Sequence, residues 1–301
     1  ICNEIKSNDE QLTQNKTENL YQEFNIKDFI ILRLIYSASK CSMFLVFHIE
    51  SFHIFLMKTA SNPEEKEINF CKNYSHRCFT KFYGFLTDDK KINGFVYEFM
   101  SNGSLSDFVQ SSNKDKVDDI YSLIAIIRIF EGIEYLQSNS LIHRDLKPQN
   151  ILIDHDYIPY ISDFETIRYL NIDETETIIT NDIGSYLYSS PEQYQGENIS
   201  FPTDIYSFGL IIYFIIMKKH LKNEKSSFMA NFSQTFQNFV DLCTNESPND
   251  RPLIKEIKNY IIEEVNFFHD YEKYLFKDTI DIDGSIIIQF IYENIIIQNE
   301  F

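Results

Sequence analysis

The sequence predicts an α+β protein with two lobes, a small β-rich lobe followed by a larger helical lobe. Short apolar runs of strand length recur from about residue 24 to residue 100, as in DFIILRLIY, CSMFLVFHI, FHIFLMKTA and KINGFVYEFM. After residue 100 the apolar residues recur at three- and four-residue spacing, which is typical of helices. The segment YSFGLIIYFIIM (206–217) is apolar nearly all round, as a fully buried helix is. Two such lobes predict a cleft between them, and clefts hold ligands.

The chain divides into three expected parts. Residues 1–23 are rich in Asn, Gln, Lys and Glu and have little apolar periodicity, so we expect a flexible lead-in. Residues 24–264 form the predicted domain, with an N-terminal lobe at 24–100 and a C-terminal lobe at 101–264. One helical segment, 62–74, interrupts the strands. The extension 265–301 ends in an Ile-rich stretch that is prone to aggregate if uncovered. We expect it to pack on the domain or on a partner.

Charge and composition exclude several classes of function. The net charge of −18 disfavours nonspecific nucleic-acid binding and repels an anionic membrane surface. The longest apolar run, 206–217, is shorter than the about 20 residues that span a bilayer, so no membrane insertion is expected. The five cysteines are scattered without a metal-binding motif, which argues against zinc and against a disulfide framework. Reduced thiols predict a cytoplasmic protein.

The segment LIHRDLKPQNILI (141–153) carries the strongest chemical signal. It places Asp145, Lys147 and Asn150 on one short loop between apolar strands. Asp163 follows Asp145 by 18 residues, a length over which a hairpin can return it beside Asn150. Together these side chains supply an acceptor for a hydroxyl proton, a cation for phosphate oxygens and two ligands for Mg²⁺. Phosphoryl transfer needs this set, because its catalysis consists mostly of positioning and charge neutralisation.

These motifs resemble those of the eukaryotic protein kinase family. HRDLKPQN (143–150) resembles its catalytic loop, and DFE (163–165) resembles its metal-binding Asp-Phe-Gly. GSYLYSSPE, DIYSFG and NDRP follow in the order that the family has, so the resemblance covers about residues 27–264. It implies a bilobal kinase fold and a serine/threonine kinase that transfers the γ-phosphoryl group of Mg·ATP to a protein hydroxyl. The sequence NGSL (102–105) is most similar to the tyrosine-kinase-like branch of the family.

The resemblance also implies roles for individual residues. Asp145 would orient the substrate hydroxyl and accept its proton, and Lys147 would hold the γ-phosphate. Asn150 and Asp163 would bind Mg²⁺.

Further residues would support that site. Glu192 and Arg251 would form a buried ion pair, and Asp204 would brace the catalytic loop. His143 is expected to be a packed core residue that supports Phe164.

Lys58 resembles the strand lysine that holds the α- and β-phosphates, and its partner would be Glu67. The two are nine residues apart, which is shorter than the interval typical of the family. The helix that carries Glu67 must therefore lack its first turn or two. We expect this helix to have little freedom to swing outward, so that the Lys58–Glu67 ion pair stays closed.

The segment FVYEFMSNGSL (95–105) resembles the hinge. Glu98 and Met100 would offer backbone groups to adenine, with Tyr97 behind them. The slot for adenine would be lined by three further side chains, namely Met43, Leu56 and Leu152. Leu56 stands where the family has a small alanine, so a narrower slot is expected.

Two parts of the site depart from the family pattern. Tyr36, Ala38 and Cys41 replace the three glycines of the phosphate-covering loop, and any position there that needs a positive φ would cost about 1–2 kcal/mol. Glu165 replaces glycine after Asp-Phe, and a carboxylate ~8 Å from a phosphate would repel it by roughly 2 kcal/mol. These changes leave a pseudokinase that acts as a scaffold or allosteric partner as the alternative to an active kinase. A pure interaction module is a third possibility.

The segment before GSYLYSSPE contains Thr175, Thr177 and Thr180. A phosphate on one of them could pair with Arg144 and order the segment. The alternative is a flexible acidic loop. Ser185 keeps a hydroxyl where serine/threonine kinases contact the catalytic loop.

Overall fold

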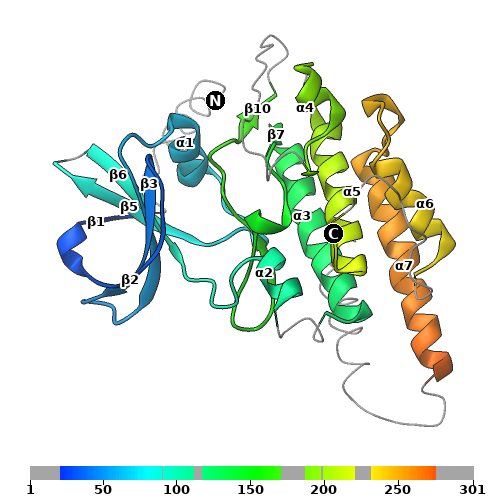
Figure 1. Cartoon of the computed structure of the whole chain (residues 1–301), viewed down its shortest axis with the longest axis horizontal. Helices are drawn as coiled ribbons and strands as arrows, with labels where there is room; N and C mark the ends of the chain where they lie inside the picture. Colours follow the sequence, from blue (N-terminus) through cyan, green and yellow to red (C-terminus); the bar gives the residue numbers. More distant parts are fainter. Residues whose placement is uncertain are drawn as a thin grey trace, which may run out of the picture. The chain divides into compact units, whose positions relative to one another are not determined.

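The computed structural model describes residues 21–89, 91–111, 117–170, 187–197, 199–220 and 232–275. They belong to two units (Figure 1). The N-terminal unit runs to Ser75 and also includes Lys81–Phe99. The C-terminal unit combines His76–Thr80 with the chain from Met100 onward. Strands dominate the first unit and helices the second, so the predicted α+β class is confirmed.

The N-terminal unit is built from a six-stranded sheet and helix α1. Its elements are β1 (Gln22–Phe24), β2 (Phe29–Ser37), β3 (Cys41–His48), β4 (Ile54–Ala60), α1 (Glu65–Asn73), β5 (Phe82–Asp88) and β6 (Lys91–Glu98). The strand order is β1-β5-β6-β4-β3-β2. Strand β1 is parallel to β5, and the other neighbours are antiparallel.

Most of these elements follow the sequence pattern, with three corrections. The four quoted apolar runs form β2, β3, β4 and β6, whereas β5 was not predicted as a strand of its own. Helix α1 begins at Glu65 rather than at residue 62. Strand β1 takes two residues from the predicted lead-in, because Phe24 is buried and the ring of Tyr21 lies 5.0 Å from that of Phe85. A Cβ on Gly84 would lie 1.9 Å from the Gln22 carbonyl oxygen, so only glycine lets β1 approach β5.

Apolar and aromatic side chains cover one face of this sheet. The buried members of the cluster are Phe24, Phe29, Val46, Phe55, Met57, Leu86 and Val96. Successive side chains of a strand point to opposite faces. Lys58, which follows Met57, therefore points to the other face, where it contacts Glu67 of α1. The sheet thus separates an apolar core from the face that carries the Lys58–Glu67 pair.

Strand β2 lies at the edge of the sheet and is unusually apolar for an exposed strand. Ile30, Leu32, Leu34 and Tyr36 are each 50–53% exposed. An apolar edge of this kind invites pairing with another chain. The pairing of β2 with β3 shifts register at two places, between Ile31 and Arg33 and between Leu34 and Tyr36. Such bulges twist an edge strand and make it a poorer template for pairing.

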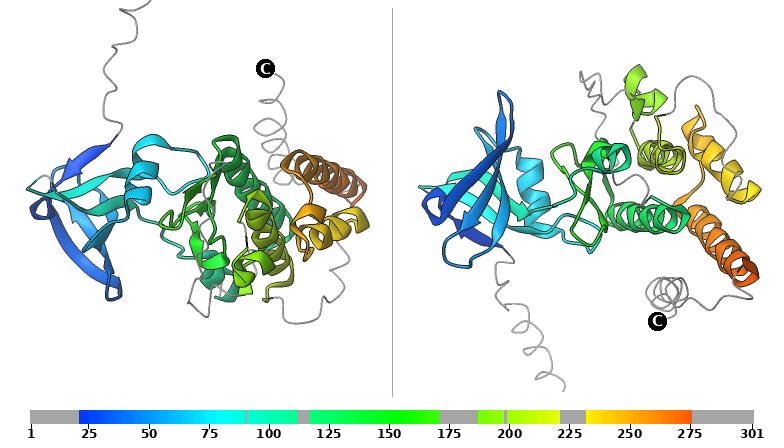
Figure 2. Two further views of the ribbon diagram at one scale, coloured as in Figure 1. Left: turned by 90° about the horizontal axis from the view of Figure 1, so that it is seen from above. Right: turned by 60° about the horizontal axis from the view of Figure 1, so that its bottom comes forward.

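The C-terminal unit is mainly helical. Its elements are α2 (Leu105–Gln110), α3 (Asp119–Ser138), β7 (Leu141–Ile142), β8 (Ile151–Ile153), β9 (Pro159–Ile161), β10 (Arg168–Tyr169), α4 (Pro191–Gln195), α5 (Phe201–Met217), α6 (Gln234–Cys243) and α7 (Ile254–Leu275). Helices α3, α5, α6 and α7 pack against one another (Figure 2). Helix α7 extends beyond residue 264, where we placed the end of the domain. The Ile-rich stretch lies outside the described residues.

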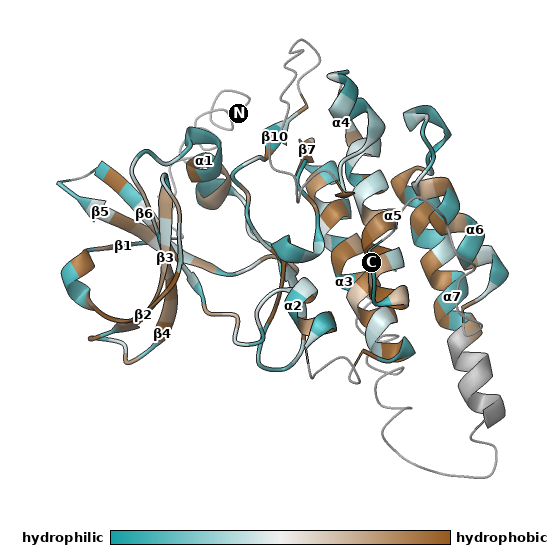
Figure 3. Cartoon of the chain, in the orientation of Figure 1, coloured by the Kyte–Doolittle hydropathy of each residue, from teal (hydrophilic) through white to brown (hydrophobic). Residues whose placement is uncertain are grey.

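Helix α5 is the buried centre of this unit, as its sequence predicted. Nearly all of its side chains from Thr203 to Ile216 are buried, and the apolar colouring of α3 and α5 in Figure 3 marks the core between them. Gly132 of α3 gives room for Ile161 and Phe79, because an added Cβ would lie 2.5 Å from the Ile161 side chain. None of the described helices combines the length and the hydropathy that crossing a membrane requires.

A short segment between α1 and β5 is built into the C-terminal unit, which the sequence did not predict. The ring of His76 stacks on Tyr135 of α3 at 4.5 Å. The Cys78 carbonyl accepts a hydrogen bond from the Ile161 amide, and the Ile161 carbonyl accepts one from Thr80. Phe79 lies 5.0 Å from Phe164 between ring centroids. These contacts fix residues 76–80 along β9.

The predicted ion pair between Glu192 and Arg251 is present and buried. Arg251 donates from Nη1 and Nη2 to the two carboxylate oxygens of Glu192, at 2.6 and 2.8 Å. Its guanidinium also donates to the backbone carbonyls of Asn245, Pro202 and Glu246. Burial raises the pKa of the Glu192 carboxyl, but the hydrogen bonds and the charge of Arg251 outweigh burial and hold that pKa below 4.5.

We predict that Glu192→Gln lowers the free energy of unfolding at pH 7 by about 3–5 kcal/mol, because it leaves a buried guanidinium without its counter-charge. The folded-state pKa of Glu192 is lowered, so its stabilisation is present above pH 4.5 and is lost as the pH falls through that pKa. The difference in free energy of unfolding between the wild type and Glu192→Gln, measured with urea, should therefore narrow below pH 4.5.

The control is Glu134→Gln, which removes a half-exposed carboxylate 3.7 Å from Lys258. Its effect should stay within about 1 kcal/mol. A difference between the wild type and Glu192→Gln that is the same at pH 7 and below pH 4 would contradict this account.

Candidate functional site

The loop between β7 and β8 gathers three of the predicted residues. Asp145 Oδ2 accepts a hydrogen bond from Lys147 Nζ at 2.7 Å and another from Asn150 Nδ2 at 2.9 Å. Asn150 Nδ2 also donates to the Asp145 carbonyl at 2.8 Å. Pro148 begins a 3₁₀ turn, Pro148–Asn150, that brings Asn150 back towards Asp145. The amide nitrogen of Asn150 makes both contacts, so its Oδ1 is the atom that can ligate a cation.

The hairpin β8–β9 delivers Asp163 to the same place. Ile151 pairs with Ile161, and the Ser162 amide and hydroxyl both donate to the Asn150 carbonyl at 2.9 Å. Asp163 is the next residue, its side chain is exposed, and its φ is +62°. Carboxylate and amide oxygens are the ligands that Mg²⁺ prefers. Asp163 and Asn150 therefore form a donor set that fits this ion.

A buried carboxylate holds the loop in place, as predicted. Asp204 of α5 accepts the His143 amide at 2.7 Å and the Arg144 amide at 2.9 Å. Burial raises the pKa of the Asp204 carboxyl, against the opposing effect of His143 and of the amide donors. Arg144 has a φ of +73°, and its carbonyl accepts from Gln193 of α4. These bonds fix the backbone on the N-terminal side of Asp145.

The rings around Phe164 confirm the prediction for His143. His143 is fully buried, its Nε2 lies 3.0 Å from the Ser162 carbonyl oxygen, and its ring lies 5.5 Å from Phe164. Thr166 donates to the His143 carbonyl at 2.8 Å. The residues on both sides of Asp163 are thereby packed, while its own side chain stays exposed.

The N-terminal unit holds the second group of predicted residues. Lys58 Nζ donates to Glu67 Oε1 at 2.8 Å, and both side chains are buried. The predicted closed pair is therefore present. Met43 lies directly opposite Lys58 on the neighbouring strand, so both side chains lie on the same face of the sheet. Leu56, two residues before Lys58, is also on that face.

The hinge residues are placed by backbone hydrogen bonds. The Glu98 amide donates to the Lys81 carbonyl at 2.9 Å, so this amide is already occupied. In the C-terminal unit, Met100 is buried and its carbonyl accepts from Gly103. The Gly103 carbonyl accepts from Ile153 of β8, which places the segment after Met100 beside the strand that carries Leu152.

The three replaced glycines cause no positive-φ strain in the turn between β2 and β3, whereas the repulsion expected from Glu165 stays a prediction. Among residues 35–43 no residue has a positive φ, so the turn between β2 and β3 does not require glycine. It is closed by the Ala38 amide, which donates to the Cys41 carbonyl at 2.9 Å. Glu165 is exposed and also has a negative φ.

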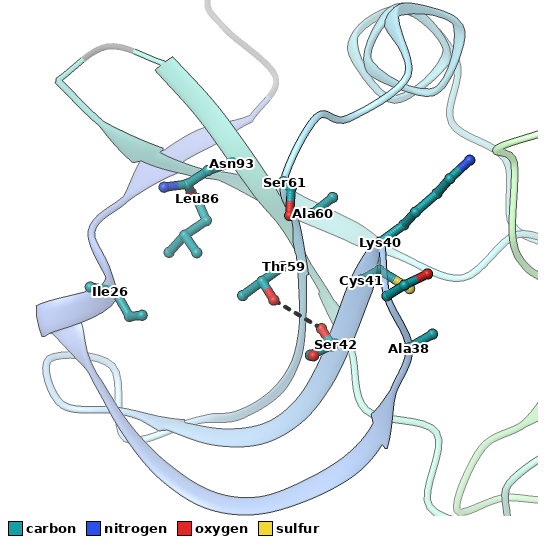
Figure 4. A pocket seen from close by; sticks show the side chains of 11 residues that line it. Ile26, Ala38, Lys40, Cys41, Ser42, Thr59, Ala60, Ser61, Leu86 and Asn93 are labelled. Atoms are coloured by element: carbon teal, nitrogen blue, oxygen red, sulfur yellow. Dashed lines mark hydrogen bonds between the residues drawn. The ribbon is translucent and has the colours of Figure 1, made fainter.

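A pocket of about 330 Å³ lies beside that turn (Figure 4). Its lining includes Ser42, Thr59 and Leu86, and Thr59 Oγ1 donates to the Ser42 carbonyl at 3.2 Å. Thr59 follows Lys58 along β4, so it points to the opposite face of the sheet. The pocket is therefore separate from the face that carries the Lys58–Glu67 pair.

Sequence reasoning missed two partners of these residues. Tyr97 was expected behind the hinge, but its hydroxyl also contacts Glu67 at 3.3 Å, and Cys71 contacts the same hydroxyl. The four-residue spacing of Glu67 and Cys71, which puts them on one helix face, could have indicated this. Thr175, Thr177, Thr180 and Ser185 lie outside the described residues.

We predict that Asp204→Asn lowers the free energy of unfolding by about 1–3 kcal/mol, because a buried backbone amide loses its acceptor. Amide hydrogen exchange at His143 and Arg144 should accelerate more than exchange in α6. Asp88→Asn, at an exposed position of β5, is the control and should change neither quantity. Unchanged protection of both amides in Asp204→Asn would contradict the bracing role.

Comparison with known proteins agrees with the resemblance. Residues 42–262 match a family described as "Protein kinase domain". Among similar proteins are "Cysteine-rich receptor-like protein kinase 19" of Arabidopsis thaliana, 35% identical over 207 residues, and a "Probable LIM domain-containing serine/threonine-protein kinase" of Dictyostelium discoideum, 30% identical over 197 residues. These alignments cover 65% and 60% of this chain, and 31% and 30% of the relatives. The chain thus spans about a third of the length of these relatives.

Proposed function

Because this chain belongs to the protein kinase family, we propose that it transfers the γ-phosphoryl group of ATP to a serine or threonine hydroxyl of a protein. The family generally uses ATP and Mg²⁺. The observation that carries the proposal is the convergence of Lys147 and Asn150 on Asp145, with Asp163 delivered beside Asn150. Such a cluster combines a proton acceptor, a cation and two metal-binding oxygens.

In this proposal Asp145 orients the attacking hydroxyl and accepts its proton. Lys147 and Asn150 already donate to Asp145 Oδ2, so one oxygen of the carboxylate is held while Oδ1 can face the substrate. Lys147 also places a positive charge next to the position of the γ-phosphate. Fixed donors of this kind reduce the reorganisation that charge transfer requires.

Mg²⁺ supplies charge neutralisation at the phosphates when it is bound. Asn150 Oδ1 and the Asp163 carboxylate are the proposed ligands. In the N-terminal unit, Lys58 is proposed to hold the α- and β-phosphates, and Glu67 keeps its ammonium in place at 2.8 Å. The carbonyl of Glu98 and the backbone of Met100 are proposed to bind adenine, which Met43, Leu56 and Leu152 would contact.

Three observations favour an active kinase over the pseudokinase alternative. The turn that lacks three glycines contains no positive φ, so its conformation does not depend on glycine. The Lys58–Glu67 pair is closed, and Asp145 accepts hydrogen bonds from both Lys147 and Asn150. A pure interaction module would leave this arrangement without a use. The serine/threonine class is supported by Lys147 and by the similarity to the Dictyostelium serine/threonine-protein kinase.

We predict that Asp145→Asn lowers the rate of phosphoryl transfer by about 10²–10⁴-fold, because the proton acceptor is lost. The assay measures radiolabel transfer from [γ-³²P]ATP to a generic basic protein, with Mg²⁺ and in parallel with Mn²⁺. Asp156→Asn is the matched control, because Asp156 is exposed in the turn between β8 and β9. It should keep wild-type activity. Equal transfer by the wild type and Asp145→Asn would reject the enzyme.

A further inference from the structure

A buried hydrogen-bond relay joins helix α1 to strand β6 inside the N-terminal unit. Glu67 Oε1 receives Lys58 Nζ at 2.8 Å and the Tyr97 hydroxyl at 3.3 Å. The Tyr97 hydroxyl also lies 3.3 Å from Cys71 Sγ. Glu67 and Cys71 are four residues apart on α1 and therefore lie on one face of the helix. The tyrosine hydroxyl thus bridges two successive turns of α1.

The chemistry of the three groups fixes the direction of the relay. An ionised carboxylate only accepts, so the single proton of the Tyr97 hydroxyl points to Glu67. The hydroxyl oxygen is then the acceptor, and the Cys71 thiol is the donor. Burial raises the pKa of Cys71 to about 12, so the thiol keeps this proton at neutral pH. Each bond polarises the next, which strengthens the contact to Glu67.

The ring of Tyr97 cannot easily move. It is 9% exposed and lies 5.5 Å from Phe82 and 6.1 Å from Phe95, between ring centroids. Helix α1, by contrast, has little stability of its own. It contains nine residues, and no side chain caps its first turn at Glu64. The position of α1 therefore depends on its contacts with the sheet.

We propose that Tyr97 is a positioning residue of the phosphate site. Its hydroxyl holds Glu67, and through Glu67 the Lys58 ammonium, in the place where Lys58 meets the nucleotide phosphates. Cys71 holds the hydroxyl in turn. The consequence is regulatory: α1 is fastened to β6 from within the N-terminal unit, so closure of the Lys58–Glu67 pair needs no signal from elsewhere in the chain. This inference rests on the proposed kinase function.

The test is Tyr97→Phe, which removes the hydroxyl and keeps the ring. We expect kcat/KM for ATP to fall by about tenfold, mainly through a higher KM, because a hydrogen bond to a charged group is lost. Amide exchange in α1 should accelerate. Tyr160→Phe is the matched control, because its hydroxyl donates to Asp154 Oδ2 at 3.1 Å in the C-terminal unit. It should change neither quantity.

A double-mutant cycle separates positioning from packing. If Tyr97 acts through Glu67, then adding Tyr97→Phe to Glu67→Ala, which leaves the hydroxyl no carboxylate acceptor, should change KM for ATP and α1 exchange by less than twofold. An equal effect in both backgrounds would overturn the proposal. Cys71→Ala should lower kcat/KM for ATP two- to threefold. Cys71→Ser should keep the wild-type value, because serine keeps a hydrogen-bond donor. Cys243→Ala, at a buried position of α6, is the cavity control.

The exchange measurement distinguishes the two proposals. Unchanged α1 exchange in Tyr97→Phe rejects the relay, whatever the activity. Faster α1 exchange together with no phosphoryl transfer by the wild type rejects the kinase function and leaves the relay standing.

Discussion

The site depends on one buried interaction. The Asp204 carboxylate accepts hydrogen bonds from the backbone amides of His143 and Arg144. Burying a carboxylate without partners is very unfavourable, so these bonds are what allow Asp204 to sit inside the helical core. They also hold Arg144 in a left-handed conformation that costs a non-glycine residue about 1–2 kcal/mol. The turn produced by this conformation directs Asp145 out of the core. Helix α5 thus supplies both apolar support and a buried carboxylate that anchors the loop.

Each unit carries one part of the proposed phosphoryl-transfer chemistry. The C-terminal unit holds the proposed proton acceptor, Asp145, and the two proposed oxygen ligands, Asn150 and Asp163, on backbone that is packed or hydrogen-bonded on both sides. The N-terminal unit holds the proposed phosphate-binding ammonium group of Lys58, which contacts Glu67, and Glu67 in turn contacts Tyr97. In the N-terminal unit, Lys58 lies on the face of the sheet opposite the apolar core and is paired with buried Glu67. In the C-terminal unit, Asp163 is exposed next to the buried Phe164. Catalysis by positioning and charge neutralisation requires this combination.

Sequence reasoning succeeded where recognisable motifs identify both partners of a contact, even when the two lie far apart in the chain. It predicted the Lys58–Glu67 and Glu192–Arg251 pairs, the bracing by Asp204 and the burial of α5. It failed where tertiary packing decides. Strand β1 depends on the small size of Gly84, and residues 76–80 belong to the C-terminal unit because of hydrogen bonds to β9, which no local pattern encodes. The sequence predicted a cost for any position of the glycine-replaced turn that needs a positive φ. No residue of that turn has a positive φ.

The central claim is that Asn150 and Asp163 bind Mg²⁺ together with the phosphates of ATP. The most direct measurement is the shift in melting temperature caused by ATP, with and without Mg²⁺, for the wild type and for Asp163→Asn. The account predicts a larger shift with Mg²⁺ in the wild type, and no difference between the two conditions in Asp163→Asn, because only the metal-dependent part of binding is lost. Two results would contradict it: a melting-temperature shift of the wild type that is the same with and without Mg²⁺, or a shift of Asp163→Asn that still increases with Mg²⁺.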